Sequence, residues 1–403
     1  MTHNVTVADI EQARETISGV INQLPIANAR WLTEMVGGPV YLVPENLQRA
    51  GSFKIRGAFN RLSRLTSEEK ARGVVAASAG NHAQGVALAA QTLGIKSTVF
   101  MPIGATIPKV EATKGYGADV EFFGTSIDEA LTAAQEFADR TGAILIHPFN
   151  HEDIVAGQGT LGLEIMEKIP DVATVVVCTG GGGLLAGVAL AIKSVNPHVT
   201  VIGVQAEEAA AYPASLAAGK PIALEKMSTM ADGIAVGRPG DIPFAIISEN
   251  VDEIITVSED ELSYAALSVL ERAKMVVEPA GAAATAAVMA DPTHFTPPVA
   301  VVLSGGNVDS LLLLRIIRHG MTAGGRYLTM QVQVPDAPGS LASLLRIVQE
   351  MSANVVEVDH NRIDPTLGVH EVEIDLQVET RGREHADAVL VAIREQGFEV
   401  TEL

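Results

Sequence analysis

The chain alternates between two hydrophobic patterns from about residue 71 to residue 310. Short runs rich in β-branched residues, such as GVVAAS (73–78) and TVVVC (174–178), each precede a longer stretch rich in Ala and Leu. Short runs that are apolar at nearly every position are typical of strands buried on both faces, and the longer stretches are typical of helices. The pattern predicts an α/β fold with mainly parallel sheets, in which ligands bind at the carboxyl ends of the strands.

The pattern changes near residue 319. The segment HGMTAGGR (319–326) is rich in glycine and lacks a strong periodicity, which predicts a linker. Residues 327–403 then predict the order strand, helix, strand, strand, helix, strand, which is the order of an α+β ferredoxin-like unit. We therefore expect a second, smaller domain after the linker, with a role in binding.

The composition excludes several classes of function. The 403 residues carry a formal charge of −20, and only 4% of them are aromatic, so we expect no nucleic-acid partner. No stretch offers about 20 consecutive apolar residues, so we expect no membrane span. A single cysteine, Cys178, and a polar N-terminal stretch of mixed charge favour a cytoplasmic protein without disulfides or a signal peptide.

Four consecutive glycines, Gly180 to Gly183, follow the strand predicted at 174–178 and precede an apolar helix. Backbone N–H groups in such a turn, together with the positive end of the helix dipole, favour a bound phosphate. A P-loop is excluded because no Gly-Lys-Ser/Thr follows. A dinucleotide site stays open, because residues 181–186 fit G-x-G-x-x-A and Glu207 follows the next strand. A glycine turn that serves only close helix–strand packing is the third alternative.

Polar residues also follow two other predicted strands. Ser78 and Asn81 stand before a helix, where they fit either a site for a small carboxylate or ordinary helix capping. Ser304 ends an apolar run and precedes two glycines, so its hydroxyl suits either a buried ring nitrogen or the cap of the next helix.

Lys54 lies in the largely apolar segment AGSFKIRGAFN (50–60). If Ser52 caps a helix that runs through Asn60, Lys54 lies in the first turn, where the helix dipole and the apolar surroundings both lower the pKa of its amine. A lowered pKa provides the neutral amine that imine formation needs. Taken alone, the segment favours a lysine whose ammonium group reaches solvent. Together with a phosphate site, a carboxylate site and Ser304, it predicts pyridoxal phosphate (PLP) as cofactor.

Four motifs resemble the threonine/serine dehydratases, a family of fold-type II PLP enzymes. They are SFKIRGA (52–58), SAGNHAQG (78–85), TGGGGL (179–184) and SGGN (304–307). The resemblance implies a two-lobed catalytic domain at 1–320 that is similar to the tryptophan synthase β chain. Its small lobe, about 52–150, would be inserted into a large lobe made of 1–51 and 151–320. An ACT-like regulatory domain would follow at 327–403.

The resemblance also implies a role for each matching residue. Lys54 would hold PLP as a Schiff base and, with Ser78, form the catalytic pair. The cofactor would contact Phe53, Asn81, Gly180, Gly181, Gly182, Gly183, Leu184, Gly233, Glu278 and Ser304. The substrate would contact Ser78, Gly80, Asn81 and His82. The implied reaction is the α,β-elimination of L-threonine, and of L-serine, to 2-oxobutanoate or pyruvate and ammonia.

The chain departs from some relatives at two places. Serine racemases of the family tend to carry a serine after the first serine of SAGN, and this chain has Ala79, which disfavours racemisation. Several relatives bind a divalent cation through a glutamate and an aspartate at positions where this chain has Gln205 and Ala211. We therefore expect no bound metal.

The ACT-like segment resembles sensors of small amino acids, with Asp336, Gly339 and Leu341 as the expected effector-binding residues. A dimerisation module without a ligand is the alternative, and a homo-oligomer, dimer or tetramer, is expected in either case. Three other activities stay open: a serine or 3-hydroxyaspartate ammonia-lyase, a non-catalytic amino-acid sensor and an NAD-dependent enzyme. Threonine and serine differ by one methyl group, worth about 1–3 kcal/mol of discrimination, so the sequence does not separate them.

Overall fold

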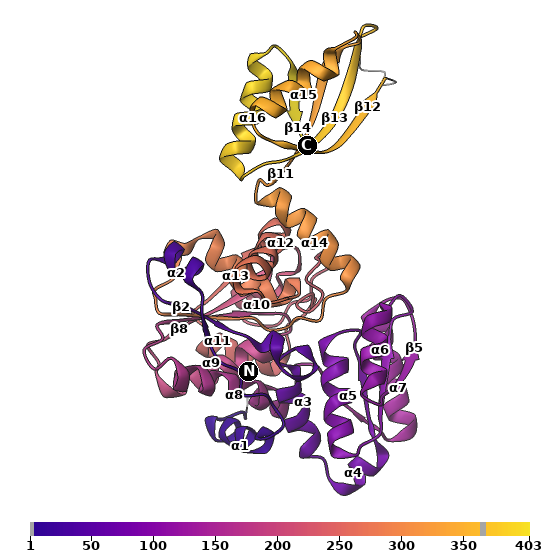
Figure 1. Cartoon of the computed structure of the whole chain (residues 1–403). Coiled ribbons are helices and arrows are strands. Elements are labelled where there is room, and N and C mark those ends of the chain that lie inside the picture. Colours follow the sequence, from indigo (N-terminus) through magenta and orange to yellow (C-terminus); the bar gives the residue numbers. More distant parts are fainter. Residues whose placement is uncertain (1–3, 363–367) are drawn as a thin grey trace. The chain divides into compact units, whose positions relative to one another are not determined.

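The computed structural model describes residues 4–362 and 368–403. The chain forms two compact units, residues 1–313 and residues 314–403, and each is described here by itself. The first unit contains two parallel sheets and the second contains one antiparallel sheet (Figure 1). The predicted fold class, an α/β arrangement followed by an α+β ferredoxin-like segment, is confirmed.

The larger sheet of the first unit has six strands in the order β1-β2-β10-β7-β8-β9, and all neighbours except β1 and β2 are parallel. Its central strands β7 and β10 are buried at every position, as their uninterrupted apolar runs predict. The strands are β1 (Ala27–Asn28), β2 (Val40–Val43), β7 (Thr174–Cys178), β8 (Thr200–Ala206), β9 (Glu253–Val257) and β10 (Val299–Val302).

Helices pack on both faces of this sheet (Figure 1). One group comprises α1 (Val7–Ile17), α8 (Glu152–Lys168), α9 (Gly183–Val195) and α11 (Asp241–Asn250). The other comprises α2 (Arg30–Val36), α12 (Glu259–Ser268) and α13 (Pro279–Ala290). Further helical segments are η1 (Glu45–Leu47), η2 (Arg49–Gly51), η3 (Glu207–Ala209), α10 (Ala211–Ala218), η4 (Val269–Ala273) and η5 (Pro292–His294).

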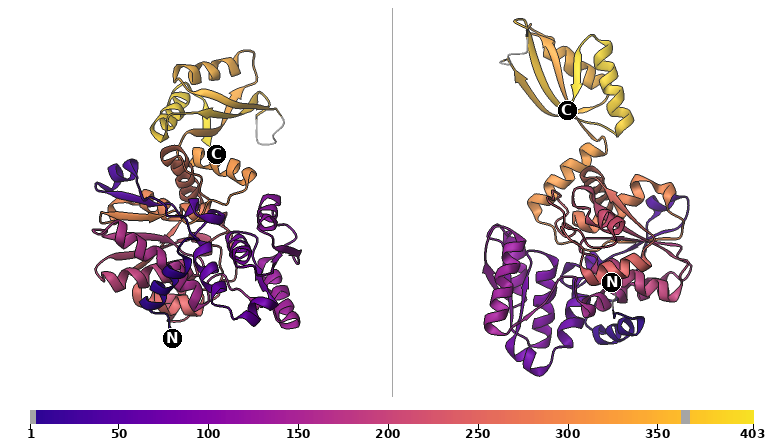
Figure 2. Two further views of the ribbon diagram at one scale, coloured as in Figure 1. Left: turned by 60° about the horizontal axis from the view of Figure 1, so that its bottom comes forward. Right: turned by 180° about the vertical axis from the view of Figure 1, so that it is seen from behind.

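The smaller sheet has four parallel strands in the order β5-β4-β3-β6. Its elements are α3 (Lys54–Ser63), α4 (Ser67–Arg72), β3 (Val74–Ala77), α5 (Asn81–Leu93), β4 (Ser97–Met101), α6 (Ile107–Gly115), β5 (Asp119–Phe122), α7 (Ile127–Thr141) and β6 (Ile144–Leu145). These elements form a lobe that lies beside the larger sheet, drawn in purple in all three views (Figures 1 and 2). Helix α3 packs against both α5 and α8, so it joins the two lobes.

The second unit begins within α14 (Ser310–Ala323). The helix continues through most of the segment that was expected to be a linker, and a turn with Gly325 at a φ of +66° follows it. The remaining elements are β11 (Tyr327–Pro335), α15 (Ser340–Glu350), β12 (Asn354–Asn361), β13 (Glu371–Glu379), α16 (Arg383–Glu395) and β14 (Glu399–Glu402). The antiparallel strands lie in the order β12-β13-β11-β14, and alternate residues of β11 pack into the apolar core shared with α15 and α16.

Candidate active site

A cavity of about 800 Å³ in the first unit is lined by residues from both lobes. All the residues predicted for catalysis, cofactor binding and substrate binding line it, although they come from distant parts of the sequence. They are Phe53, Lys54, Ser78, Gly80, Asn81, His82, Gly180, Gly181, Gly182, Gly183, Leu184, Gly233, Glu278 and Ser304. Strands β3, β7 and β10 all end at the cavity, as expected for ligand sites at the carboxyl ends of parallel strands.

Lys54 is the first residue of α3, and its amine stays inside the cavity. Lys54 Nζ donates a hydrogen bond to the carbonyl oxygen of Pro148 at 3.2 Å and lies 5.0 Å from the centre of the Phe53 ring. Loss of hydration lowers the pKa of the amine to about 8, although the charge of Glu278 acts in the opposite direction. The expected cap by Ser52 is wrong, because the buried Ser52 hydroxyl has no hydrogen-bond partner among the residues that the structure describes, and Phe53 precedes the helix without capping it.

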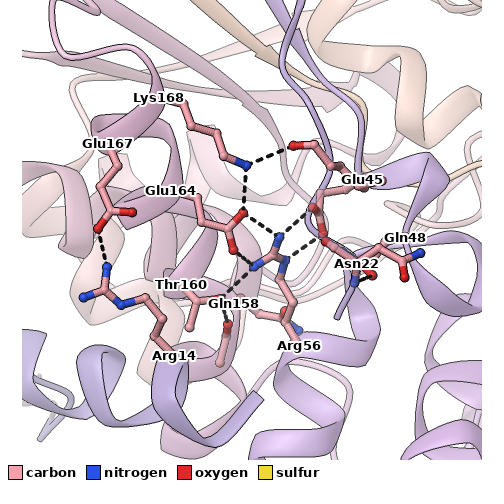
Figure 3. Close-up of polar contacts among 12 residues, drawn as sticks. Arg14, Asn22, Glu45, Gln48, Arg56, Gln158, Thr160, Glu164, Glu167 and Lys168 are labelled. Atoms are coloured by element: carbon pink, nitrogen blue, oxygen red, sulfur yellow. Dashed lines mark hydrogen bonds and ion pairs between the residues drawn. The ribbon is translucent and has the colours of Figure 1, made fainter. Parts of the chain in front are cut away.

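The start of α3 is anchored by Arg56, which is completely buried. Its guanidinium donates two hydrogen bonds of 2.7 Å to Glu45, two of 2.6 and 3.2 Å to Glu164 and one of 3.1 Å to Thr160 (Figure 3). Burial opposes the charge of Arg56, but the two carboxylates outweigh burial and raise its pKa above the usual value. This cluster ties α3 to η1 and α8, and so it fixes the helix that carries Lys54.

The glycine turn leads into α9, which begins at Gly183 and has no side-chain cap. A Cβ atom at Gly181 would overlap the Phe149 ring, and one at Gly182, whose φ is +97°, would overlap the Tyr212 hydroxyl. Close packing therefore accounts for these two glycines. The first N–H groups of a helix also lack acceptors within the helix, so the same turn offers donors to an anion in the cavity. The glycine turn is therefore compatible with both close packing and the binding of an anion.

The acidic residue that a dinucleotide site would need does not reach this cavity. Glu207 follows β8 as predicted, but its side chain is exposed and it is not among the residues that line the cavity. The prediction of a dinucleotide site therefore rests on the G-x-G-x-x-A match at 181–186 alone.

The polar residues after β3 do not serve as ordinary helix caps. Asn81 Nδ2 donates to Glu278 Oε1 at 2.5 Å, and Asn81 Oδ1 accepts from Asn307 at 2.8 Å. The Ser78 hydroxyl accepts from the N–H of Gly80 at 3.1 Å, while Gly80 stands at the N-cap of α5. These side chains thus stay at the cavity wall.

Two further titratable groups of the cavity are neutral or close to neutrality. Burial lowers the pKa of His82 to about 3, and its Nε2 lies 2.8 Å from the carbonyl oxygen of Ile146. Burial raises the pKa of Glu278 to about 7, and the nearby charge of Asp232 adds to the effect. Loss of hydration is therefore the main cause of the pKa shifts of both groups.

Ser304 lies at the end of β10, next to the end of β7. Its hydroxyl accepts a hydrogen bond from the Cys178 thiol, with 3.1 Å between Sγ and Oγ. Burial raises the pKa of this thiol to about 11, so it keeps its proton at neutral pH. Ser304 does not cap the next helix, because α14 begins at Ser310 and Asp309 accepts from the N–H of Leu311 at 2.9 Å.

The sequence reasoning missed a turn that lines the cavity, residues 147–150 with the sequence HPFN. His147, Pro148 and Phe149 lie in the cavity wall, directly after the last strand of the small lobe. A His-Pro pair that directly follows an apolar run was the available signal. The segment 223–238 was also missed apart from Gly233, and Asp232 in it forms an ion pair of 2.5 Å with Lys109 of α6.

The predicted effector residues lie in the second unit, with Asp336 and Gly339 in the turn between β11 and α15 and Leu341 in the first turn of α15. The backbone N–H of Asp336 donates to the carbonyl oxygen of His370 at 2.8 Å, and the Asp336 side chain pairs with Arg362 at 3.3 Å. Gly339 stands at the N-cap of α15 with a φ of +98°, and Leu341 packs against the apolar core of the unit.

The cavity residues fit PLP. The amine of Lys54, the open helix start after the glycine turn and the buried hydroxyl of Ser304 match the three groups that PLP presents: an aldehyde, a phosphate and a ring nitrogen. A family model described as "Pyridoxal-phosphate dependent enzyme" matches residues 17–305. The chain belongs to this family.

Relatives among the pyridoxal-phosphate-dependent enzymes agree with the resemblance of the four motifs. The chain is 47% identical over 396 residues to an L-threonine ammonia-lyase of Thermotoga maritima, an alignment that covers 98% of this chain and 99% of that protein. It is 44% identical over 308 residues to a catabolic L-threonine dehydratase of Escherichia coli K12, covering 76% of this chain and 94% of that protein. The structure of maize serine racemase superposes with a TM-score of 0.74 at 34% identity, covering 79% of this chain and 99% of that one.

These matches confirm the predicted family, its PLP cofactor and the fold-type II architecture. Within residues 4–362 and 368–403, no group of three or more His, Cys, Asp or Glu side chains could hold a metal ion. Gln205, one of the positions that departs from metal-binding relatives, uses its side-chain amide to bond Thr179 and Tyr212. None of the helices in these residues is both long and apolar enough to cross a membrane.

Proposed function

We propose that the chain catalyses the α,β-elimination of L-threonine, and of L-serine, to 2-oxobutanoate or pyruvate and ammonia. The observation that carries the proposal is the amine of Lys54, held inside a cavity that both lobes line and lowered in pKa to about 8. The relatives named L-threonine ammonia-lyase and L-threonine dehydratase support threonine as the substrate.

In the proposed site, bound PLP supplies an electron sink for the substrate Cα. Lys54 would hold the cofactor, and its released Nζ, neutral in part at physiological pH, would take the Cα proton. The side chains of Ser78 and Asn81 and the first turn of α5 would bind and orient the substrate carboxylate. Water lost from Cα and Cβ is regained on hydrolysis, so threonine gives one 2-oxo acid and one ammonia.

The other polar groups would bind the cofactor at its phosphate and at its ring nitrogen. The N–H groups at the start of α9 would bind its phosphate, and Ser304, which already accepts from Cys178, would have its own proton for the ring nitrogen. Ala79 offers no proton to the second face of the substrate, which favours elimination over the reaction named for the maize relative.

A substrate panel tests the proposal. The purified holoenzyme is incubated with L-threonine, L-serine and 3-hydroxyaspartate, and 2-oxo acid and D-amino acid are both quantified. We expect the highest kcat/KM for threonine and no D-amino acid. A higher kcat/KM for serine or 3-hydroxyaspartate would show that threonine is not the preferred substrate. Turnover of serine to D-serine alone would contradict the proposed elimination.

We further propose that the second unit binds a small amino acid through Asp336, Gly339 and Leu341, and that the chain forms a homo-oligomer. The open start of α15 and the carboxylate of Asp336 offer partners for an amino acid's carboxylate and ammonium groups. Isothermal titration with isoleucine and valine, compared between the wild type and Asp336→Ala, tests the binding. Light scattering gives the oligomeric state, and a monomer that binds neither amino acid would overturn this part.

A further inference from the structure

The turn at residues 147–150 is organised by one imidazole ring. His147 Nδ1 lies 3.2 Å from the backbone nitrogen of Phe149 and 2.9 Å from that of Asn150, and it accepts from both. A ring nitrogen accepts only when it carries no proton, so the ring is neutral with its proton on Nε2. Burial lowers the pKa of His147 to about 4, and the charge of Lys54 adds to the effect, in agreement with this geometry.

The same turn supports three parts of the cavity. The carbonyl oxygen of Pro148 accepts from Lys54 Nζ at 3.2 Å. The ring of Phe149 fills the space behind Gly181 in the glycine turn. Asn150 Oδ1 accepts from the N–H of Ile242 at 3.0 Å, which ties the turn to the start of α11.

We propose that His147 is a positioning residue: its Nδ1 fixes the turn so that the Pro148 carbonyl holds the Lys54 amine at the cavity. The amine needs such a partner whenever it is not bonded to the cofactor, because it stands at the end of a flexible four-carbon stem, and the Pro148 carbonyl is the acceptor that it meets. His147 acts through Pro148 and is not itself the base. The inference rests on the proposed role of Lys54.

Two variants separate positioning from packing. His147→Leu keeps an apolar volume but removes the acceptor. His147→Asn keeps an acceptor, because an asparagine side chain bonds the N–H two residues further along in an Asx turn. In the full-length holoenzyme we expect His147→Leu to lower kcat for threonine by about 10- to 100-fold with little change in KM, since misplacing a reacting group by about 1 Å can cost about 100-fold. His147→Asn should recover most of this loss.

A second measurement does not depend on turnover. The rate at which cofactor-free full-length protein binds added PLP covalently, followed by absorbance as a function of pH, reports the ionisation of the free Lys54 amine. We expect a displaced titration midpoint in His147→Leu and a midpoint near the wild-type value in His147→Asn. If His147→Leu does not accumulate as folded protein, His147→Ala replaces it in both measurements.

The results that overturn the inference are specific. Wild-type kcat and an unchanged midpoint in His147→Leu would show that the ring does not position the amine. Equal losses in both variants, with KM and thermal stability changed in parallel, would show that the ring only packs. A wild-type holoenzyme that turns over none of the panel amino acids, yet shows the midpoint displaced by Leu and restored by Asn, would contradict the proposed reaction and leave the role of His147 standing.

Discussion

Two buried cations lie two residues apart on α3, and their surroundings differ completely. Arg56 meets Glu45 and Glu164 in a closed cluster between α3, η1 and α8, and the carboxylates raise its pKa despite burial (Figure 3). Lys54 meets no carboxylate at hydrogen-bond distance among the described residues, and loss of hydration lowers its pKa to about 8. One helix thus carries a fixed charge for structure and a variable charge that we propose serves the chemistry.

The difference teaches how a reactive amine can be kept without losing the fold. A guanidinium forms two parallel hydrogen bonds with a carboxylate and stays charged, so it suits a permanent anchor. An ammonium group is a compact charge whose pKa responds readily to burial. Because Arg56 anchors the helix, Lys54 does not need a strong partner of its own.

The largest expected effect comes from removing the variable charge. Lys54→Ala should lower kcat for threonine by at least about 1,000-fold, because a positioned base contributes about 100- to 10,000-fold and the covalent attachment is lost as well. Turnover, together with borohydride reduction and peptide mapping of the label, measures both losses. Lys54→Arg, which keeps a positive charge but forms no covalent bond with the cofactor, is the matched control and should be equally inactive. Wild-type turnover in either variant would remove Lys54 from the mechanism.

Removing the fixed charge should affect stability. Arg56→Met removes the guanidinium from the carboxylates of Glu45 and Glu164, of which Glu164 keeps the Lys168 ammonium group at 3.6 Å, so we expect the free energy of unfolding to fall by about 3–5 kcal/mol. Urea denaturation of the holoenzyme gives the value. The control is Arg14→Met, which removes a partly exposed pair with Glu167 and should cost less than about 1 kcal/mol. Similar losses in the two variants would contradict the assigned difference between buried and exposed pairs.

A third buried titratable group, Glu278, tests the comparison through pH. Its pKa is raised to about 7 in the folded chain, mainly by burial, against about 4.3 for an unperturbed glutamate. The folded state therefore binds the extra proton, and the associated stability is full below about pH 4.3 and is lost as the pH rises through about 7. In cofactor-free full-length protein, the unfolding free energy of wild type relative to Glu278→Gln should fall by up to about 1.4 kcal/mol per pH unit in this window.

Denaturation at several pH values between 5 and 8 provides this measurement. Glu225→Gln, which removes an exposed carboxylate from the same cavity, controls for the loss of a charge at that site. A pH-independent difference between wild type and Glu278→Gln would mean that Glu278 keeps its ordinary ionisation and that burial does not govern this cavity.

The smallest expected effect concerns an ion pair that is only partly buried. Lys109 of α6 is largely buried, but its partner Asp232 is about half exposed, so Lys109→Ala should cost about 1 kcal/mol or less. Because Asp232 belongs to the segment that lines the cavity, KM for threonine should rise several-fold. A double-mutant cycle with Asp232→Asn isolates the pair, and a coupling energy near that of the Arg56 cluster would erase the distinction.

The sequence predicted the cavity better than the supports around it. The strand ends at Ser78 in the smaller sheet and at Gly180 and Ser304 in the larger one indicated where ligands bind, because parallel strands bring their carboxyl ends to one edge of a sheet. Gly233 and Glu278 followed only from the resemblance. Several supports depend on tertiary contacts. Glu45 and Glu164 are about 120 residues apart and read as ordinary surface carboxylates until the fold brings both to Arg56.

Local patterns also misled in two places. Ser52 looked like a helix cap, yet it lies in extended backbone after η2, and the helix begins without a side-chain cap. The segment at 319–326 looked like a linker, yet α14 continues to Ala323. The helix ends only where two consecutive glycines, Gly324 and Gly325, follow it. Propensity indicates where a helix can end, and packing decides where it does.

The bond between Cys178 and Ser304 also has a practical consequence. The only thiol of the chain lies at the cavity floor, is almost fully buried, and keeps its proton because burial raises its pKa to about 11. A thiol in that state reacts slowly with alkylating reagents and with oxidants. The protein therefore carries one natural chemical reporter beside Ser304, the residue proposed to meet the ring nitrogen of the cofactor. Its labelling rate should increase when the cofactor is removed, with no engineered cysteine and no background from other thiols.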